Sequence, residues 1–311
     1  MKSLLKMELF KWRKSKSFVV CSIIAVGLMI FVIGTFAALG AVLEMAEEEM
    51  TAEFEAQKPG MIQEYVDSGM SREEAEMTVE AEIADAKMML SVELIQTDGQ
   101  NLFICSAYQS SVHILIAIFV ALFTAAEFSS GTMKIMVASG KGRTKIYFAK
   151  LLVVSLAATI MMLIPMLIGL AGGSAIWGFY PESGAIAAKT VTLLILVQFV
   201  LNLAITSMFM AISVIFRSLG AAIALNIAIF QFSSIIFALA DALYDYILNV
   251  LEIEETKVVP SSLWIINAFM NSSTPVNFKM DVFTRNMIVG VVYFAIFTLI
   301  GLQAFRKRDI K

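Results

Sequence analysis

Residues 127–150, EFSSGTMKIMVASGKGRTKIYFAK, form a basic segment between two long apolar runs. These runs, residues 105–126 and 151–181, contain no Asp, Glu, Lys or Arg. About 20 helical residues, rising 1.5 Å each, cross a hydrocarbon core of about 30 Å. Both runs are therefore long enough to span a membrane, and we expect residues 127–150 to be a loop at one membrane surface.

Four more uncharged runs extend this arrangement along the chain: residues 18–43, 190–216, 218–240 and 286–305. The chain is 59% hydrophobic, above the roughly 45–50% that is typical of soluble domains. Lipid cannot hydrogen-bond a bare backbone, so runs of this length indicate helices. We predict an all-α integral membrane protein with six transmembrane helices in a single domain, residues 1–311.

The basic residues orient these spans, because Lys and Arg collect on the cytoplasmic side of a membrane protein. Six spans place sixteen of the 23 basic residues on one side, at the two termini, in residues 127–150 and at Arg217. The first run, with 26 uncharged residues, is too long for a signal-peptide core of about 7–15 residues. We therefore expect both termini in the cytoplasm.

Residues 258–278 are also uncharged, but they contain Pro260, Pro275 and many Ser and Asn residues. Such groups are costly in a lipid-exposed helix, and a seventh span would move the basic C-terminal tail outside. We predict that residues 241–285 form an extracellular or re-entrant segment with a short helix buried against the bundle.

Residues 1–17 place Leu5, Leu9 and Trp12 at helical spacing, with basic residues off that stripe. This pattern favours an amphipathic helix at the cytoplasmic membrane interface. The alternative is a basic tail that sets topology without structure of its own.

Residues 44–104 are predicted to be a helical extracellular insertion, and residues 44–98 hold sixteen of the 26 carboxylates. Pro59 and Gly60 are expected to break its first helix, and Ser71 with Glu74 has the spacing of a capping box at the start of the next. The second helix is expected to present an apolar stripe: Met70, Met77, Ala81, Ala84 and Met88. The acidity of the insertion either attracts a cationic substrate or marks a solvated face.

Polar side chains recur in the fourth and fifth spans. Gln198, Asn202 and Thr206 repeat every four residues and share one helix face, and Asn226 and Gln231 follow in the next span. Amides in lipid seek partners across helices. These five residues either line a translocation path or hold the helices together.

Motifs for catalysis are absent from the sequence. The single histidine, His113, favours a packed role over a proton relay, and the two cysteines, Cys21 and Cys105, form no CxxC motif. Residues 139–144, SGKGRT, lack the GxxxxGK[ST] pattern of a phosphate loop. We expect no enzyme activity, no metal, no cofactor and no nucleic-acid partner for this chain.

The loop carries a recognisable order of residues. A Glu ends the second span, a Gly-Thr pair follows four residues later, then an Arg, and then a Lys that leads into the third span: Glu127, Gly131, Thr132, Arg143 and Lys150. This order resembles the membrane subunits of type-2 ATP-binding-cassette (ABC) exporters. The resemblance covers nearly the whole chain, although this chain has Gly140 and Gly142 where many members have a Pro before the Arg.

The resemblance implies that residues 127–146 are a coupling loop that docks on a separate ABC ATPase subunit, which binds ATP-Mg. It implies a permease that pairs with a second permease subunit, identical or paralogous, and with two ATPase copies in a bacterial cell membrane. The best expectation for the substrate is an amphipathic or antimicrobial peptide, and hence a role in antibiotic resistance. The implied coupling residues are Glu127, Gly131, Thr132, Ile135, Met136, Arg143 and Lys150. Of this loop, Ile135, Met136 and Val137 are expected to offer apolar contact to the ATPase.

A passive channel or a membrane assembly scaffold without an ATPase partner is the alternative function. A carboxylate at the end of a span, such as Glu127, is costly unless it is paired or solvated. We therefore expect Glu127 to pair with a basic residue of the loop or of the N-terminal helix.

Overall fold

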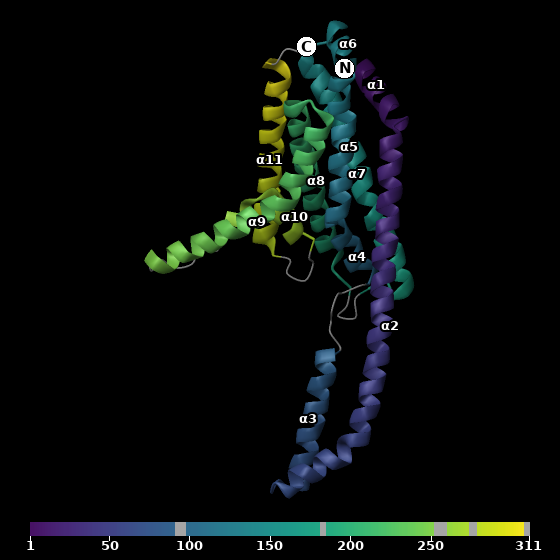
Figure 1. The fold of residues 1–311 in the computed structure, drawn as a ribbon, viewed down its shortest axis with the longest axis vertical. Helices are drawn as coiled ribbons and strands as arrows, with labels where there is room; N and C mark the ends of the chain where they lie inside the picture. The colour runs from purple at the N-terminus through teal and green to yellow at the C-terminus, as the bar shows by residue number, and fades with distance from the viewer. Residues whose placement is uncertain (91–97, 181–184, 252–259, 274–278, 308–311) are drawn as a thin grey trace.

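The computed structural model describes residues 1–90, 98–180, 185–251, 260–273 and 279–307 (Figure 1). These residues form helices and connecting turns without a β-strand. Among them, six helices are long and apolar enough to cross a membrane, which confirms the predicted all-α class with six candidate spans. They are α2 (Lys16–Asp67, with its apolar part at Lys16–Val42), α5 (Ser110–Ser129), α7 (Arg143–Ile176), α8 (Ala188–Phe216), α9 (Leu219–Leu251) and α11 (Met280–Lys307).

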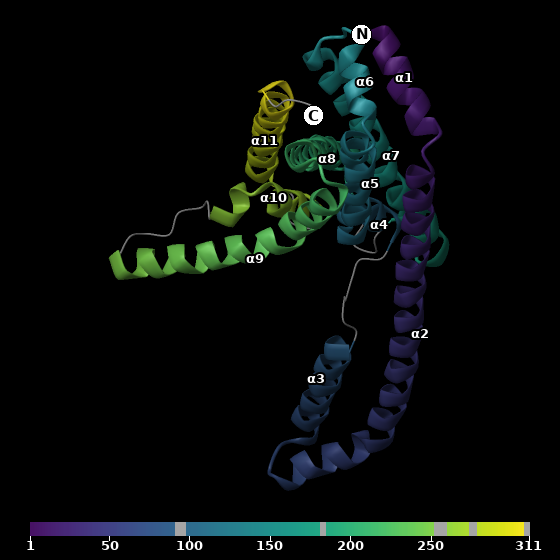
Figure 2. The same cartoon turned by 45° about the horizontal axis from the view of Figure 1, so that its top comes forward.

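Shorter helices lie at the two ends of this bundle. The N-terminal helix α1 and the loop helix α6 lie at the same end as the C-terminal part of α11, which we call the terminal end (Figure 1). Helices α4 and α10 lie toward the opposite end, which we call the distal end (Figure 2). Their bounds are α1 Lys2–Arg13, α3 Arg72–Leu90, α4 Gly99–Cys105, α6 Thr132–Ala138 and α10 Ile265–Asn271, with 3₁₀ turns at Ser106–Tyr108 and Pro260–Leu263.

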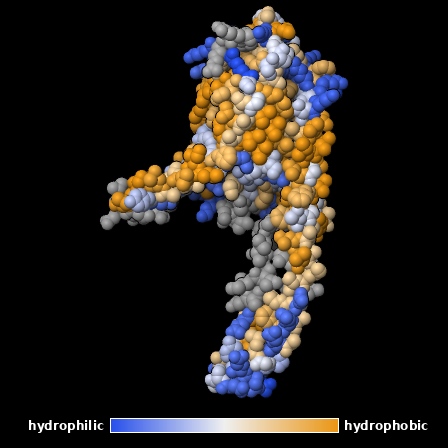
Figure 3. Space-filling view, in the orientation of Figure 1, coloured by the Kyte–Doolittle hydropathy of each residue, from blue (hydrophilic) through white to orange (hydrophobic). Residues whose placement is uncertain are grey.

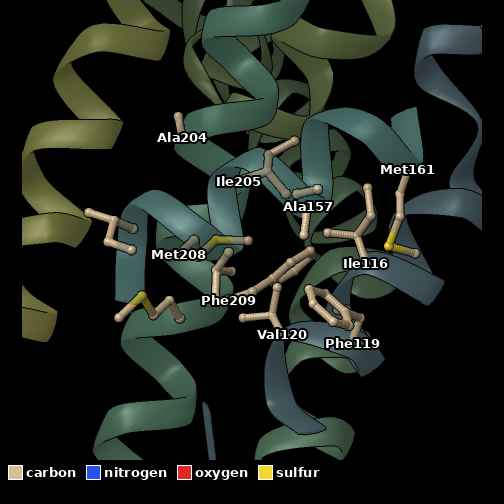
Figure 4. Close-up of a cluster of buried hydrophobic side chains, with 14 of the residues drawn as sticks. Ile116, Phe119, Val120, Ala157, Met161, Ala204, Ile205, Met208 and Phe209 are labelled. Atoms are coloured by element: carbon tan, nitrogen blue, oxygen red, sulfur yellow. The ribbon is translucent and has the colours of Figure 1, made fainter. Parts of the chain in front are cut away.

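Helix α8 lies at the centre of the bundle and contacts α4, α5, α7, α9, α10 and α11. Its side chains interlock with those of α5 and α7 in an apolar core (Figure 4). Gly290 lets α11 approach α8, because a Cβ there would lie 2.8 Å from Cγ1 of Val200. The labelled core residues are Ile116, Phe119 and Val120 of α5, Ala157 and Met161 of α7, and Ala204, Ile205, Met208 and Phe209 of α8.

On the face shown in Figure 3, the bundle is largely apolar between its ends, whereas polar side chains gather at the terminal end and at the far tip of α2 and α3. This distribution is the one expected of a bundle whose middle part is covered by lipid.

Helix α2 continues for 52 residues, far beyond its apolar part, and Pro59 lies inside it. The predicted break at Pro59 and Gly60 is therefore wrong. Proline removes one backbone donor but keeps a helical φ, so in this exposed part of α2 the chain bends toward α3 without leaving the helix (Figure 1). The helix ends at Asp67, and Gly69, with φ of 99°, makes the turn that follows.

Helix α3 folds back on α2 as a hairpin. The predicted capping box is confirmed, because Glu74 N donates to Ser71 Oγ at 3.3 Å and Ser71 N donates to Glu74 Oε2 at 3.2 Å. Lys58 and Glu80 join the two helices, with 2.9 Å between Nζ and Oε1.

The apolar stripe expected on α3 is not the face that packs against α2. Ala75 and Val79 are buried in this helix, whereas Met77, Ala81 and Ala84 are exposed. Small side chains allow the two helices to approach closely, whereas the expected stripe followed the methionine spacing. Met70 precedes the helix and is exposed as well, and the side chain of Met88 lies outside the described part of the chain.

Helix α9 begins in the bundle and then runs away from it (Figures 1 and 2). Its second half leaves large apolar side chains exposed, among them Ile236, Leu239 and Leu243 at 60–67%. Of the segment predicted at 241–285, residues 252–259 and 274–278 lie outside the described residues. In its described part, α10 buries Ile265, Ile266, Ala268 and Phe269 in the bundle.

Candidate functional site

The loop between α5 and α7 contains one short helix, α6, at the terminal end (Figure 2). Gly131 stands at its N-cap with φ of 73°, a left-handed conformation that glycine adopts without a steric cost. Met133 and Met136 point from α6 into the protein and are buried, whereas Ile135 is 74% exposed. The helix therefore presents an isoleucine outward from a firmly packed base.

Four charged side chains meet beneath α6, and we call them the charge cluster: Glu8, Lys11, Glu127 and Lys150. Lys150 Nζ lies 3.0 Å from Glu8 Oε2 and 2.9 Å from Glu127 Oε2. Lys11 Nζ lies 3.1 Å from Glu8 Oε1 and 3.1 Å from Glu127 Oε1. Each lysine thus bridges the same two carboxylates, and the formal charges of the cluster cancel.

Burial makes this pairing necessary. Glu8 and Lys150 are each 1% exposed, and a charge taken out of water is costly unless it is paired and hydrogen-bonded. Lys150 is enclosed further by Phe123, whose carbonyl oxygen lies 3.5 Å from Nζ and whose ring centroid lies 4.6 Å away. The cluster therefore fixes the relative positions of α1, α5 and α7, which supply its members.

The fourth member, Lys11, stays more accessible and touches α6 directly. Its Nζ donates to Met136 Sδ at 3.4 Å. Burial opposes the charged form of Lys11, but the attraction of Glu127 and Glu8 outweighs it and raises the pKa of Lys11 above its usual value of 10.5. Lys11 is therefore held as a cation between α1, α5 and α6.

The sequence-predicted coupling residues fall into two groups of three, with Arg143 apart from both. Glu127, Met136 and Lys150 come together at the charge cluster. Gly131, Thr132 and Ile135 lie on α6 or at its start, where Thr132 Oγ1 is 3.0 Å from Ser130 Oγ. Arg143 begins α7, and its Nη1 donates to the carbonyl oxygen of Arg306 on α11 at 2.8 Å.

The pairing of Glu127 follows the expectation, because one partner, Lys11, belongs to the N-terminal helix and the other, Lys150, ends the loop segment. Met136, expected to offer apolar contact to another protein, is instead packed inward. Of the apolar side chains expected for docking, only Ile135 is largely exposed, and Val137 is half-buried.

Sequence reasoning missed Glu8 and Lys11. The expected stripe of Leu5, Leu9 and Trp12 is half-buried, whereas the buried face of α1 is centred on Leu4 and Glu8. One signal was present, since Glu8 is the only carboxylate among residues 1–17. A lone acid on a basic helix indicates a specific partner.

The polar residues of α8 and α9 lie apart from the charge cluster. Gln198 Nε2 donates to the carbonyl oxygens of Ile104 and Ser272, each at 3.0 Å, and so joins α8 to α4 and to the end of α10. Asn226 Nδ2 donates to Ala117 O at 3.4 Å and to Ser213 Oγ at 3.3 Å. Both amides bond across helices, which favours helix packing over a path for these two residues.

The other three residues behave differently. Asn202 and Thr206 are fully buried, and their side chains form no hydrogen bond to the described residues. Gln231 is exposed on α9. The structure therefore buries four of the five predicted path residues inside one chain and leaves Gln231 outside.

His113 has the packed environment that was expected. It is fully buried, its Nδ1 lies 3.2 Å from Gln109 O, and its ring stacks on Phe230 with 5.4 Å between centroids. In the described parts of the chain, no group of three or more His, Cys, Asp or Glu side chains is arranged to hold a metal ion.

One family model matches the chain, over residues 62–311, and its description is "Protein of unknown function (DUF2705)". No curated protein and no solved structure matches the chain. The matched residues include Glu127, α6 and Lys150, whereas α1 lies before them.

Proposed function

This chain belongs to the DUF2705 family, and we propose that it is the membrane permease subunit of an ATP-driven type-2 ABC exporter. A separate ATPase subunit binds ATP-Mg and docks at α6. The permease pairs with a second permease subunit and moves its substrate out of a bacterial cell.

In this proposal the terminal end faces the cytoplasm, where Lys and Arg are expected to collect. Helix α1 then lies at the membrane interface, with its exposed basic residues toward the headgroups and Leu4 toward the bundle. At the distal end α10 is a re-entrant helix, and the α2–α3 hairpin projects outside the cell.

The observation that carries the proposal is the exposed Ile135 on a helix with a rigid base. Exposed apolar surface with a polar rim is typical of contacts with partner proteins, and in this proposal Ile135 is the apolar centre of such a contact. Met133 and Met136 anchor α6 below, and the charge cluster connects that anchor to α1, α5 and α7. A displacement of α6 by a partner bound at Ile135 would thus be transmitted to α1, α5 and α7 together, as coupling to an ATPase requires.

A passive channel or scaffold remains the alternative, and α6 discriminates between the two. Passive transport requires no protein partner at the terminal end, so substitution of Ile135 would leave it unchanged. The exporter requires one, and it also requires that the partner supply the ATP-binding site.

The second permease subunit is expected to cover α9. Its exposed apolar side chains extend beyond the rest of the bundle, and a second copy related by a two-fold axis buries the same face on both partners. The proposed substrate is an amphipathic peptide, since the α2–α3 hairpin is acidic and helical and attracts cations.

Affinity purification of the full chain from its native host tests the proposal. The expected result is co-purification of an ABC ATPase, together with ATP-dependent uptake of a cationic amphipathic peptide into inverted vesicles. Recovery of the chain without an ATPase, with peptide flux that is independent of ATP, would favour the passive alternative.

A further inference from the structure

We propose that a groove at the distal end of α11 binds one zwitterionic phospholipid whose headgroup ends in a primary ammonium. The groove has a volume of about 560 Å³, and its walls are the first turns of α11 and Leu263 of the Pro260–Leu263 turn. This volume lies within the range of about 300–1,000 Å³ that is usual for ligand sites. It suits a headgroup and the first part of the acyl chains.

Most of the groove's lining is apolar, and its polar side chains lie at its mouth, at the start of α11. Asp281, Thr284 and Arg285 line the first part, and Ile288 and Val289 line the second. Residues four apart share one face of a helix, so these side chains form a continuous strip. Because α11 runs from the distal end toward the terminal end (Figure 1), the apolar part lies nearer the middle of the span, where the acyl chains of a bound lipid would run along the surface.

The charges at the mouth do not neutralise each other. Asp281 and Arg285 have the spacing of a helical ion pair, but no ion pair joins them, and Asp281 has none with any other described residue. Arg285 Nε instead lies 3.4 Å from Asn286 Oδ1. Among the described residues, no partner occupies the carboxylate of Asp281 or the Nη groups of Arg285, so both can bind a ligand.

These two groups match the two charges of the headgroup. A guanidinium binds a phosphate through paired N–H donors. A carboxylate accepts hydrogen bonds from a primary ammonium, whereas the quaternary ammonium of a choline headgroup has no N–H to donate. An anionic headgroup without an amine is repelled by Asp281. The groove therefore selects phosphatidylethanolamine over phosphatidylcholine and phosphatidylglycerol.

This inference requires the helices to lie in a bilayer, but it does not depend on an ATPase partner. Failure to co-purify an ATPase would leave it intact, and loss of the lipid preference would leave the exporter proposal intact.

Native mass spectrometry of the full chain in detergent tests the preference. The probes are phosphatidylethanolamine, phosphatidylcholine and phosphatidylglycerol with identical acyl chains, and bound lipid is measured at equal concentrations. The expected affinity for phosphatidylethanolamine is about tenfold higher than for phosphatidylcholine, the effect of one charge-assisted hydrogen bond. Asp281→Asn should abolish this ratio, and Arg285→Gln should weaken binding of both lipids.

Lys279→Gln is the matched control, because Lys279 is exposed at the same end but does not line the groove. It should leave the ratio unchanged. The proposal is overturned by a ratio near one in the unaltered chain, by an unchanged ratio in Asp281→Asn, or by an equal loss in Lys279→Gln. A dimer that dissociates in Arg285→Gln would also overturn it, since a second copy would then fill the groove.

Discussion

Lys150 at the start of the third span and Glu127 at the end of the second form an ion pair, with 2.9 Å between Nζ and Oε2. This pair closes the loop that carries α6, because one partner stands on each side of it. Glu8 of α1 also pairs with Lys150, with 3.0 Å between Oε2 and Nζ, and thereby joins α1 to the two helices that flank the loop. The loop helix therefore moves with the bundle.

Replacing Lys150 by methionine should strongly destabilise the protein. The variant leaves Glu8 buried with Lys11 as its one remaining cation, and removal of one partner of a buried ion pair costs about 3–5 kcal/mol. Thermal unfolding in detergent measures this loss. Lys145→Met on the exposed face of α7 is the control, and equal losses in the two variants would refute a special role for Lys150.

The stability of the protein should depend on Lys11 at alkaline pH. The folded state raises the pKa of Lys11 above 10.5, so its stabilising effect is complete below pH 10.5 and is lost as the pH rises through the raised value. Lys11→Arg stays charged, since the pKa of arginine exceeds 12. Between pH 9 and pH 12 the melting temperature should fall more steeply in the unaltered chain than in this variant. Parallel curves would contradict the prediction.

Gly131→Ala should lower stability by about 1–2 kcal/mol, the usual cost of a left-handed backbone for a residue with a Cβ. Gly131 has φ of 73°, and no atom lies within 4 Å of an added Cβ, so backbone strain is the whole effect. Gly142→Ala is the matched control, because its surroundings are equally open and its φ is −52°. The same melting temperature for both variants would rule out strain at Gly131.

Ile135→Asp should abolish ATPase binding and leave the fold intact. The side chain is 74% exposed, and substitutions at such positions usually change stability by less than about 0.5 kcal/mol. Thr144→Asp introduces the same charge at an exposed position of α7. Co-purification of the ATPase with the Thr144 variant but not with the Ile135 variant is the expected result, and retention by both would remove α6 as the docking helix.

A cysteine on the exposed face of α9 should cross-link two copies of the chain. In a variant with Cys21→Ser and Cys105→Ser, Leu239→Cys should give a disulfide dimer on mild oxidation of membranes. Leu167→Cys on α7 is the control, because Leu167 is also an exposed apolar residue. Dimers of equal yield from both positions would indicate random collision in the membrane.

Hydropathy sufficed to predict the six candidate spans, because lipid imposes a length and a composition on each helix. The capping box of Ser71 and Glu74 was also predictable, since it depends on residues three positions apart. The sequence also predicted that Glu127 pairs with basic residues, because a carboxylate at the end of a span requires a cation.

The features that the sequence did not predict depend on packing between residues far apart in the chain. Glu8 lies next to Leu4 on the buried face of α1 because Lys150, far along the chain, lies opposite it. On α3 the buried face follows Ala75 and Val79, whose small size matters only against α2. Pro59 stayed in its helix because one lost hydrogen bond is tolerated where water can replace it. None of these outcomes is encoded in local spacing.

Helix α2 is a continuous helix of 52 residues, about 78 Å along its path at 1.5 Å per residue. It begins beside the charge cluster and ends at the tip of the α2–α3 hairpin (Figure 1). It can therefore act as a lever arm: a tilt of about 5° at its base would displace the tip by roughly 7 Å over such a length. A small change in the tilt of α2 at the terminal end would therefore move the hairpin tip by far more than it moves the start of the helix, because α2 is continuous between the two.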